Sequence, residues 1–590
     1  MSTIGAEQWA GEVRSIPDAL RLRSRLQPDQ SAYVYLRNGE EPDGSLTYRQ
    51  LDHAARVRAA HLTAAGAAGQ NVVLLYPSGL EFVRSLLGCM YAGVAGAPVQ
   101  VPRRWQGLAR LRRVADDAGT TTVLTTTEVK RELERSFADA PELAGLTLVD
   151  TESLPEGPAD DWRYVSPPPG GTALLQYTSG STGDPKGVVI THANFAANAA
   201  ETDELWPCGD DARVISWLPL FHDMGLLFGV VLPLWAGVPS YMMEPEAFIR
   251  RPARWLEAVS RFRGTHAAAP SFAYELCVRA AQEGGVGTEL DLSSWRVAAN
   301  GAEPVRWQTV QAFTEAFAPI GFAARAMCPG YGLAENTLKV TGSPGDREPG
   351  VLLLSARGLH EGRAESLGEA AGEEVPLVSS GVPVPGTVVR IVDPATRLAC
   401  ADDRVGEIWV DGPCVGAGYR GRAEESEQTF RARIEGEPAG TYLRTGDLGF
   451  LRDGELYVTG RLKDVIIRQG RNYYPQDIEL SAESAVPGLH PNCSVAFSVP
   501  GDQAERLVVL VEADGRVLKS PGVRELRKRV RDAVWENQRL EADEILVVRR
   551  GALSRTSSGK VQRRLCRSRY TDGELAQAAV AGQEDQWPAN

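Results

Sequence analysis

A run of glycines and hydroxyl residues that ends in a lysine, YTSGSTGDPKG at residues 177–187, is the part of this chain best suited to chemistry. The glycines let successive amide groups turn toward one anion, the hydroxyls add donors, and Lys186 adds a mobile positive charge. Pro185 and Gly187 stand where a Walker-type P-loop needs a glycine and a Ser or Thr, so that class is disfavoured. A surface turn is the plain alternative. Alone, the loop predicts phosphate binding and no particular reaction.

Three further segments carry side chains that could serve a nucleotide reaction. In YLRTGDLG, Asp447 is expected in a tight glycine turn, where it could accept hydrogen bonds from both hydroxyls of a ribose. CPGYGLAE offers Tyr331 as an aromatic face for a base and Glu335 as a carboxylate for a hard cation. SRTSSGKVQRR exposes Lys560 on a Ser/Gly loop. Their ordinary alternatives are an Asx turn, core packing with a helix start, and a solvated turn.

The composition limits the class of protein. A chain of 590 residues with 43% hydrophobic content is too long to fold around a single hydrophobic core, so two to four folding units are expected. The net charge of -13 argues against bulk attraction to nucleic acid or anionic lipid. Eight scattered cysteines without a CxxC pair fit reduced thiols and give no zinc signature. No stretch approaches the ~20 apolar residues of a membrane span and the N-terminus lacks an apolar segment, so a cytoplasmic protein is predicted.

The elements that must position these residues alternate between strand and helix. Residues 72–76, VVLLY, precede a longer helical pattern, and similar pairs recur along the chain, which is typical of parallel βαβ units. The phosphate loop is expected between a strand at 172–176 and a helix from Thr191, at a strand end. From Pro383 short strands and turns predict a β-rich subdomain, and after Arg461 a further alternation begins.

We therefore expect an α/β protein of two parts. The first is a large N-terminal domain of several subdomains at residues 1–460, with parallel α/β layers and a β-rich subdomain at 383–460. The second is a small, mobile α+β C-terminal lobe at 461–570. The polar tail at 571–590 is expected to be frayed and disordered.

The order of these segments resembles the adenylate-forming superfamily of acyl ligases and luciferases across nearly the whole chain. The resemblance implies ATP and Mg2+, with Glu335 as metal ligand and catalytic residue, Lys560 as a mobile catalytic lysine and Lys463 as the hinge pivot. It also implies that the glycine loop, the strand end NGAEP, the YGxxE segment, the TGD aspartate and the GRLKD arginine bind the nucleotide. These residues are Thr178, Ser179, Gly180, Ser181, Thr182, Gly183, Lys186, Gly301, Ala302, Glu303, Pro304, Tyr331, Gly332, Asp447 and Arg461.

The chemistry that the resemblance implies suits these side chains. A substrate carboxylate attacks the α-phosphorus of ATP, pyrophosphate leaves and an acyl-adenylate forms, so negative charge on both reacting anions must be neutralised. Lys560 and magnesium would supply that neutralisation. Loss of one such electrostatic partner typically costs ~3 kcal/mol or more.

Finer details resemble the fatty acyl-AMP ligase branch of the superfamily. Four segments agree with that branch: SWLPLFHDMGL, DLSSWRVAANGAEPV, RQGRNYYPQDIE and RTSSGKVQRR. Residues 340–378 resemble the insertion of the branch, whose VLLL at 351–354 could pack against the large domain and hinder the conformation used for CoA. A long surface loop is the alternative. Ala334 departs from the threonine that often precedes the glutamate in the superfamily, so a hydroxyl contact to phosphate is missing.

The branch implies a fatty or related carboxylic acid as substrate and the phosphopantetheine thiol of a separate acyl carrier protein as acceptor. Between Pro521 and Tyr570, 14 Lys or Arg stand against 6 Asp or Glu. A basic dock for an acidic carrier, testable at Arg563 and Arg564, is one hypothesis, and solvated helix faces are the other. By resemblance, three residues line the acyl pocket, the first also being a catalytic candidate: His222, Met224 and Phe272. Core packing is their alternative.

Three other interpretations stay open. An acyl-CoA synthetase would share every nucleotide residue and differ in the acceptor. A non-catalytic nucleotide-binding or scaffold protein would be expected to lose Lys560, Glu335 or Asp447, and all three are present. An NAD-dependent oxidoreductase is suggested by GAGYRG at 416–421, but the acidic RAEESEQTF that follows would crowd a pyrophosphate.

Overall fold

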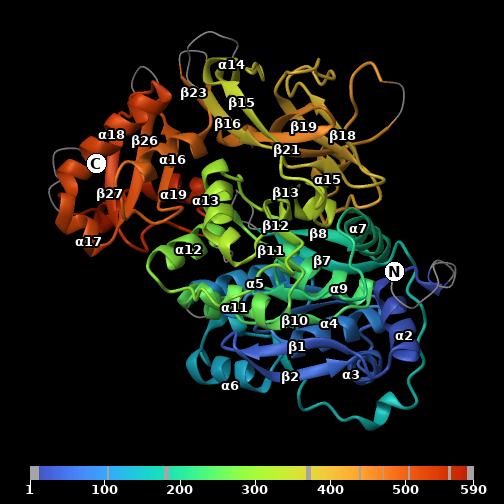
Figure 1. Ribbon diagram of the computed structural model, residues 1–590. Coiled ribbons are helices and arrows are strands. Elements are labelled where there is room, and N and C mark those ends of the chain that lie inside the picture. The colour runs from blue at the N-terminus through green and yellow to red at the C-terminus, as the bar shows by residue number, and fades with distance from the viewer. Residues whose placement is uncertain are drawn as a thin grey trace.

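Two large sheets with helices on their faces form the lower body of the molecule, with a β-rich region and a separate lobe above them (Figure 1). The computed structural model describes residues 9, 12–102, 105–178, 185–366, 374–437, 440–468, 471–501, 505–555 and 560–580. Within these ranges strands and helices alternate as expected, and the predicted α/β class is confirmed. No helix in these ranges has the length and apolar character needed to cross a bilayer.

A nine-stranded sheet of the described residues is parallel through its middle and antiparallel at both ends. Its order is β17-β14-β13-β12-β11-β9-β10-β1-β2. Because β12 and β13 are parallel neighbours, the NGAEP and YGLAE segments that follow them emerge at one edge of the sheet. Its strands are β1 (Ser31–Arg37), β2 (Glu41–Thr47), β9 (Val214–Ser216), β10 (Ser240–Met242), β11 (His266–Ala269), β12 (Val297–Asn300), β13 (Met327–Gly332), β14 (Lys339–Gly342) and β17 (Val382–Pro383).

A second sheet of seven described strands has the order β20-β8-β7-β4-β3-β5-β6. Its strands are β3 (Asn71–Leu75), β4 (Ala95–Val99), β5 (Thr122–Thr125), β6 (Thr147–Asp150), β7 (Thr172–Thr178), β8 (Lys186–Thr191) and β20 (Gly418–Tyr419). The expected strand-to-helix position of the phosphate loop is wrong, because β8 follows the loop and pairs antiparallel with β7. The β-branched residues of KGVVIT favour this extra strand, so the loop connects a hairpin.

Helices cover both sheets, and capping side chains fix where several of them start. Thr191 caps the helix that follows β8: its hydroxyl accepts the Asn194 N–H, and the Asn194 side chain accepts the Thr191 N–H. The helices of the body are α2 (Ile16–Leu26), α3 (Tyr48–Ala64), α4 (Leu80–Tyr91), α5 (Trp105–Ala118), α6 (Thr127–Ser136), α7 (His192–Leu205), α8 (Asp223–Leu226), α9 (Leu232–Ala236), α10 (Pro245–Arg250), α11 (Ala253–Phe262), α12 (Ser271–Gln282) and α13 (Trp307–Phe317). A π-helical turn, η3 (Leu227–Val231), joins α8 to α9.

The β-rich region is a four-stranded antiparallel sheet with one helix, α15 (Ala423–Phe430). Its strands are β18 (Val388–Val392), β19 (Gly406–Asp411), β21 (Leu443–Arg452) and β22 (Glu455–Arg461). Asp447 was expected in a tight turn and instead lies inside β21, in register with Arg461 of β22. Gly446 beside it has a φ of +72°, so the strand is locally distorted and does not turn back.

The segment expected as an insertion is a hairpin with a short helix: β15 (Val351–Ser355), α14 (Ala356–His360) and β16 (Glu374–Val378). It begins after Gly342 and not at residue 340, because β14 includes residues 340–342. Leu354 is fully buried against Leu448, Phe450 and Tyr474. Leu354, with the partly buried Leu352, therefore packs on the β-rich sheet and on the C-terminal lobe, while Leu353 is exposed.

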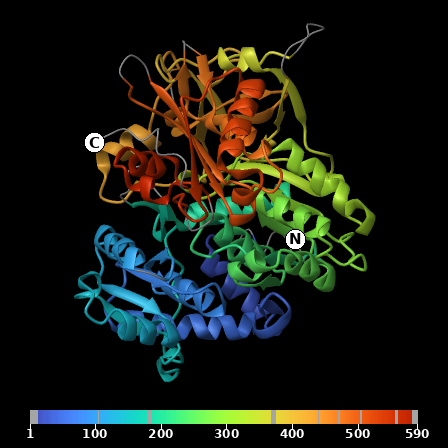
Figure 2. The same cartoon turned by 90° about the vertical axis from the view of Figure 1, so that its left-hand side faces the viewer.

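The C-terminal lobe has its own core on each side of a three-stranded sheet. Alternate residues of β26 enter the two cores, with Leu507, Val509 and Val511 on one side and Val508 and Leu510 on the other. The strands and helices of the lobe are β23 (Ile466–Arg468), β24 (Arg471–Tyr473), α16 (Pro475–Ser484), β25 (Ser494–Val499), β26 (Arg506–Ala513), α17 (Gly515–Val517), α18 (Val523–Gln538), β27 (Glu544–Arg549) and α19 (Arg563–Thr571). Figure 2 shows this lobe, in red, packed over the upper half of the molecule.

Two expected boundaries change. Arg461 still belongs to β22, so the body ends one residue later than 460, and the short 3-10 turn η7 (Leu462–Asp464) with Lys463 connects it to β23. The tail was expected to fray from residue 571, which is wrong for residues 571–580. There a 3-10 turn, η9 (Glu574–Ala578), buries Leu575 completely in the core of the lobe. Residues 581–590 lie outside the described part of the chain.

Candidate active site

A cavity of about 2200 Å3 lies where the carboxyl ends of β12 and β13, the β-rich sheet and the lobe meet. Most of the nucleotide-binding and catalytic residues predicted from sequence line it. These lining residues are Lys186, His222, Met224, Gly301, Ala302, Glu303, Pro304, Tyr331, Gly332, Glu335, Asp447, Arg461, Lys463 and Lys560. The rest of the glycine loop, Ser179, Gly180, Ser181, Thr182 and Gly183, lies outside the described residues, as does the side chain of Thr178. The individual roles of all these residues stay predictions.

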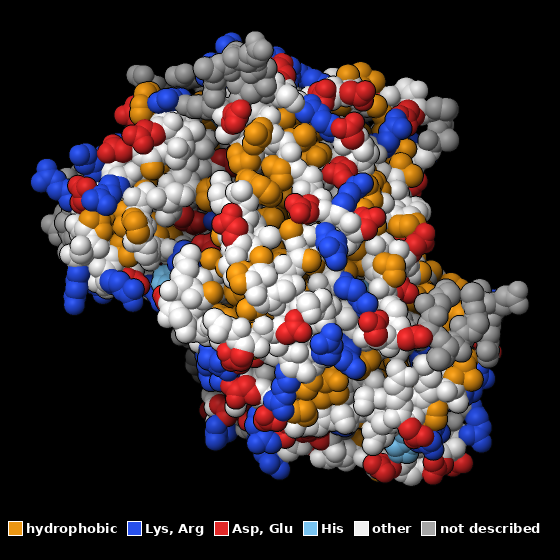
Figure 3. All heavy atoms as spheres, in the orientation of Figure 1, with side chains coloured by type: hydrophobic (Ala, Val, Ile, Leu, Met, Phe, Trp, Pro, Cys, Tyr) orange, Lys and Arg blue, Asp and Glu red, His pale blue; other side chains and the backbone are white. Residues whose placement is uncertain are grey.

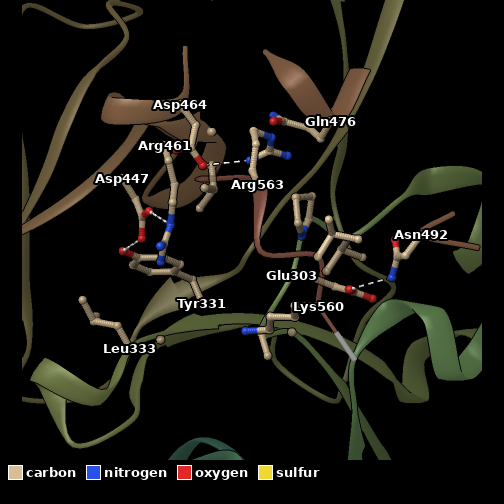
Figure 4. Close-up of a pocket in the computed structure, with 18 of the residues that line it drawn as sticks. Glu303, Tyr331, Leu333, Asp447, Arg461, Asp464, Gln476, Asn492, Lys560 and Arg563 are labelled. Atoms are coloured by element: carbon tan, nitrogen blue, oxygen red, sulfur yellow. Dashed lines mark hydrogen bonds and ion pairs between the residues drawn. The ribbon is translucent and has the colours of Figure 1, made fainter. Parts of the chain in front are cut away.

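Asp447 is held by two neighbours at the wall of this cavity. The Tyr331 hydroxyl donates to its Oδ2 at 2.8 Å, and Arg461 Nε lies 3.0 Å from its Oδ1. The Asp447 charge raises the pKa of Arg461 above its ordinary value. Figure 4 shows the tyrosine and the arginine both directed at the carboxylate. Strand pairing of β21 with β22 places Asp447 and Arg461 side by side, so a fixed carboxylate with hydrogen-bond partners is built in before any ligand arrives.

The two loops at the sheet edge come close enough to leave no room for side chains at their glycines. A Cβ on Gly301, in the NGAEP loop, would lie 2.7 Å from the Gly330 carbonyl oxygen of β13. Ala302, in the NGAEP loop, has a φ of +67° and so adopts the left-handed conformation that L-residues rarely use. This close approach presents backbone groups of both loops to the cavity.

Glu335, Tyr419 and Lys186 form a second group at the other side of the strand end. The Tyr419 hydroxyl donates to Glu335 Oε1 at 2.7 Å, and burial raises the pKa of Glu335. Lys186 Nζ lies 5.3 Å from the centre of the Tyr419 ring and is ion-paired with Glu425. Sequence reasoning missed Tyr419 and Glu425, since GAGYRG was considered only as a weak dinucleotide signal and otherwise as a turn. Its Gly418–Tyr419 pair forms β20, which β8 aligns beside the phosphate loop.

Lys560 enters the cavity from the lobe and lies between the Asp447 group and Glu303 (Figure 4). Burial lowers its pKa, while Asp223, Glu303 and Asp447 act to raise it. Burial acts to raise the pKa of Asp223, but His222 and Lys560 hold it below its ordinary value. His222 Nδ1 lies 2.6 Å from Asp223 Oδ1 at the start of α8. The lysine is therefore surrounded by carboxylates that can hold its positive charge.

Contacts between the body and the lobe hold Lys560 in this place. Glu303 accepts the Phe272 N–H at 2.7 Å and the Asn492 side-chain amide of the lobe at 3.2 Å. Arg306 of the body and Glu483 of the lobe form an ion pair at 2.9 Å. Sequence reasoning missed Arg306, Asn492 and Glu483, since no motif relates residues so far apart in the chain.

Three sequence predictions meet further contacts in the structure. The ring of Phe272, predicted to line the acyl pocket, packs 6.3 Å from that of Trp217 and is not among the described residues that line the cavity, so its role stays a prediction. Arg563 was proposed as part of a carrier dock, but it is ion-paired with Glu479 and Asp464 inside the lobe at 2.8 Å each. Reversing its charge would disturb the lobe itself. Arg564 Nε lies 3.8 Å from Asp464 Oδ1, so the charge of Arg564 is also partly paired.

Lys560 of the lobe and the carboxylates of the body meet in one cavity at the carboxyl end of an α/β sheet, the usual place for a nucleotide in such folds. Residues 20–420 match the AMP-binding enzyme family, and residues 463–580 match the AMP domain of Disco-interacting protein 2-like proteins. The chain belongs to the AMP-binding enzyme family. Its predicted resemblance to the fatty acyl-AMP ligase branch is confirmed by the relatives described next.

Curated relatives and solved structures match nearly the whole chain. Medium-chain-fatty-acid acyl-carrier-protein ligase JamA of Moorena producens is 40% identical, over 98% of this chain and 97% of its own. Long-chain-fatty-acid–AMP ligase FadD26 of Mycobacterium tuberculosis is 36% identical, over 96% and 99%. The crystal structure of a fatty acyl-adenylate ligase from Legionella pneumophila, in complex with acyl adenylate and pyrophosphate, is 36% identical over 97% and 98%, with a TM-score of 0.75.

Proposed function

We propose that this enzyme joins a fatty or related carboxylic acid to AMP, using ATP, and then passes the acyl group to the phosphopantetheine thiol of an acyl carrier protein. The observation that carries the first step is the convergence of Lys560 with Asp447, Tyr331, Arg461 and Glu335 in one cavity. Support for both steps comes from relatives with those activities in their names that match the chain end to end.

The cavity suits ATP in one orientation. Asp447, steadied by Tyr331 and Arg461, can accept both ribose hydroxyls, since a carboxylate offers several acceptor positions. The loop from Asn300 to Pro304 and the aromatic face of Tyr331 flank the same wall and suit the adenine ring. Lys186, which is paired directly with Thr178 across the β7–β8 hairpin, carries the positive charge that the phosphates need.

The residues present fit a Mg2+ ion that arrives with the nucleotide. Among the described residues, no group of three or more His, Cys, Asp or Glu side chains could hold a metal alone. Glu335 is a half-buried carboxylate fixed by Tyr419, and Mg2+ is commonly held by one or two carboxylates together with substrate phosphates. Bound there, the ion would offset charge on the phosphate oxygens.

Lys560 provides the charge that the reacting groups lack. The substrate carboxylate attacks the α-phosphorus and pyrophosphate leaves, so two anions must approach each other. A protonated lysine can contact a carboxylate oxygen and an α-phosphate oxygen at once, and Asp223 and Glu303 favour its protonated form in a buried place. The enclosing lobe also excludes water, which would hydrolyse the adenylate.

The acid enters on the side of α8. Met224 lines the cavity and is buried, and His222 caps α8 next to Asp223. The apolar wall continues into η3, where Phe228 also lines the cavity. An acyl chain could therefore lie against this wall with its carboxylate toward Lys560.

Helix α18 is the surface of the lobe that best suits docking of the carrier protein. Arg524 and Lys528 are exposed on this helix, away from the ion pairs that occupy Arg563, whereas the exposed Arg529 is paired with Glu525 at 2.8 Å. Figure 3 shows Lys and Arg side chains projecting from the lobe at the left of the view. Carrier proteins are generally acidic, so a basic helix on an otherwise acidic enzyme can steer the encounter.

Product analysis tests the proposed function. The purified protein is incubated with ATP, Mg2+ and a mixed pool of fatty acids, alone, with CoA, and with a phosphopantetheinylated carrier protein. Mass spectrometry is expected to show acyl-AMP in all three and acyl-carrier in the third. Acyl-CoA as the main product would identify an acyl-CoA synthetase instead, and no adenylate with any acid would contradict the proposal.

A further inference from the structure

Lys339 is an unusual residue at the far side of the cavity. It begins β14, and its side chain is only 3% exposed. Among the described residues its amine has no hydrogen-bond or ion-pair partner. Its Nζ lies 3.0 Å from the centre of the Trp206 ring, and both residues line the cavity. No motif pointed to Lys339, because a lone lysine at the start of a strand is normally a surface residue.

The backbone of Lys339 is fixed by two buried asparagines. Asn198 donates to its carbonyl at 3.0 Å and accepts its N–H at 3.2 Å, and Asn336 donates to the same carbonyl at 2.8 Å. The Trp206 indole N–H donates to the Ser343 carbonyl at 2.8 Å, which fixes the ring below the amine. The position of the amine is therefore set by the fold.

A continuous wall leads from the reaction centre to this amine. Asp223, which Lys560 influences electrostatically, begins α8, and Met224 and Phe228 follow on the same helical segment. A helix rises ~1.5 Å per residue, so Phe228 lies about 7 Å along the axis from Asp223. The Phe228 ring is 5.9 Å from that of Trp206, against which the lysine lies.

Nothing described in the protein satisfies this amine. Burial lowers the pKa of Lys339 well below its ordinary value, and the Trp206 ring gives partial compensation. Glu201 is the nearest carboxyl influence, but it accepts a hydrogen bond from the Cys414 thiol at 3.1 Å and forms no ion pair with Lys339 within the described chain. A buried polar group without a partner is costly to fold around, so a ligand that supplies the missing partner is the simplest reason for it.

We propose that Lys339 binds a second carboxylate on the chain of the acid substrate, so that the enzyme selects dicarboxylic acids over plain alkyl acids of equal length. This inference rests on the proposed function, because it assigns the acyl chain to the wall from Met224 to Trp206. An incoming carboxylate would raise the pKa of the amine and form a charge-assisted hydrogen bond with it in an enclosed place. A plain alkyl chain would leave the amine without a partner.

ATP–pyrophosphate exchange with acids in matched pairs tests the proposal. Each pair holds a monocarboxylic and an α,ω-dicarboxylic acid of equal chain length, and the proteins are wild type, Lys339→Met and Thr341→Val. For the best pair, the wild-type preference for the dicarboxylic acid is expected to exceed that of Lys339→Met by about 100-fold or more, because a site built for a polar group strongly rejects its absence. Thr341 lines the same cavity, but its hydroxyl already donates to the Ser380 carbonyl, so Thr341→Val should keep the wild-type preference.

The outcomes separate this inference from the proposed function. If the ratio of exchange rates with dicarboxylic and plain acids is the same in wild type and Lys339→Met, Lys339 does not select the acid. The proposed ligase activity would still stand, because plain acids drive exchange. A preference for ω-hydroxy or ω-keto acids that Lys339→Met abolishes would overturn the dicarboxylate assignment. No exchange with any acid would overturn both.

A binding measurement on wild type tests the proposal if the Lys339→Met variant fails to fold. Lys339→Met should unfold at the wild-type temperature or above, because a thioether replaces an unpaired buried amine. If it does not fold, calorimetry of wild type in buffers of different ionisation enthalpy replaces it. The dicarboxylic acid is expected to bind with more proton uptake than its monocarboxylic partner, and equal uptake would overturn the proposal.

Discussion

The ion pair between Arg306 and Glu483 should control how well the lobe docks on the body. Their side chains are 17% and 8% exposed, and the pair joins the two parts directly. Glu483 also accepts hydrogen bonds from the Ser494 N–H and hydroxyl within the lobe. Replacing Arg306 with Met therefore leaves Glu483 bound inside the lobe, and the loss falls on docking rather than on the folding of the lobe.

The size of the effect follows from the burial of the pair. Removing one partner of a buried ion pair costs about 3–5 kcal/mol, because the other charge is left without compensation. Arg306 keeps some exposure, so the lower end applies, and about 3 kcal/mol corresponds to roughly 100-fold in the docking equilibrium. Since Lys560 reaches the cavity only with the docked lobe, acyl-AMP formation should slow by a similar factor.

Exchange of labelled pyrophosphate into ATP measures this step, and a fluorescence pair on the body and the lobe reports docking. Arg306→Met and Glu483→Gln are each expected to slow exchange and to lower the docked population. The double variant should lose much less than the sum, since both charges leave together. A rate for Arg306→Met within about twofold of wild type, the usual error of additivity, would refute the role of the pair.

Three further predictions concern single steps. Asp447→Asn should raise KM for ATP by roughly 10- to 100-fold, because a charged acceptor for ribose is lost, and should leave KM for the acid unchanged; equal effects on both would contradict it. Burial lowers the pKa of Lys560 below that of a free lysine, so the exchange rate should fall as pH rises through the lowered pKa, because the protonated amine is the active form; the same alkaline fall in Lys560→Ala would contradict it. Arg524→Glu with Lys528→Glu should slow acyl transfer to the carrier about tenfold at low salt and spare exchange; unchanged transfer would exclude α18 as the dock.

Much of the fold was predictable because local patterns agree with it. Buried strands such as NVVLL alternate with helical segments, and glycine-rich segments fall at strand ends. The hairpin at the phosphate loop was not predicted, because KGVVIT merges with the helix pattern that follows it. Thr191 marked the helix start correctly, since it is the capping residue.

The candidate site was predictable where a motif holds the side chain next to its own partners. Asp447 and Arg461 lie in one hairpin, and Tyr331 lies near the end of β13, with Glu335 shortly after that strand. Tyr419, Arg306 and Lys339 were missed, because each acts through a contact made by tertiary structure. Arg563 was misjudged for the same reason, since net charge along a helix does not show which arginines are already paired.

The decisive measurement is ATP–pyrophosphate exchange driven by fatty acids in wild type and Lys560→Ala. We expect acid-dependent exchange in the wild type and a loss of at least about 100-fold in the variant, with an unchanged unfolding temperature, because the lysine neutralises the reacting anions and does not hold the lobe together. Equal exchange in the two proteins would contradict the account.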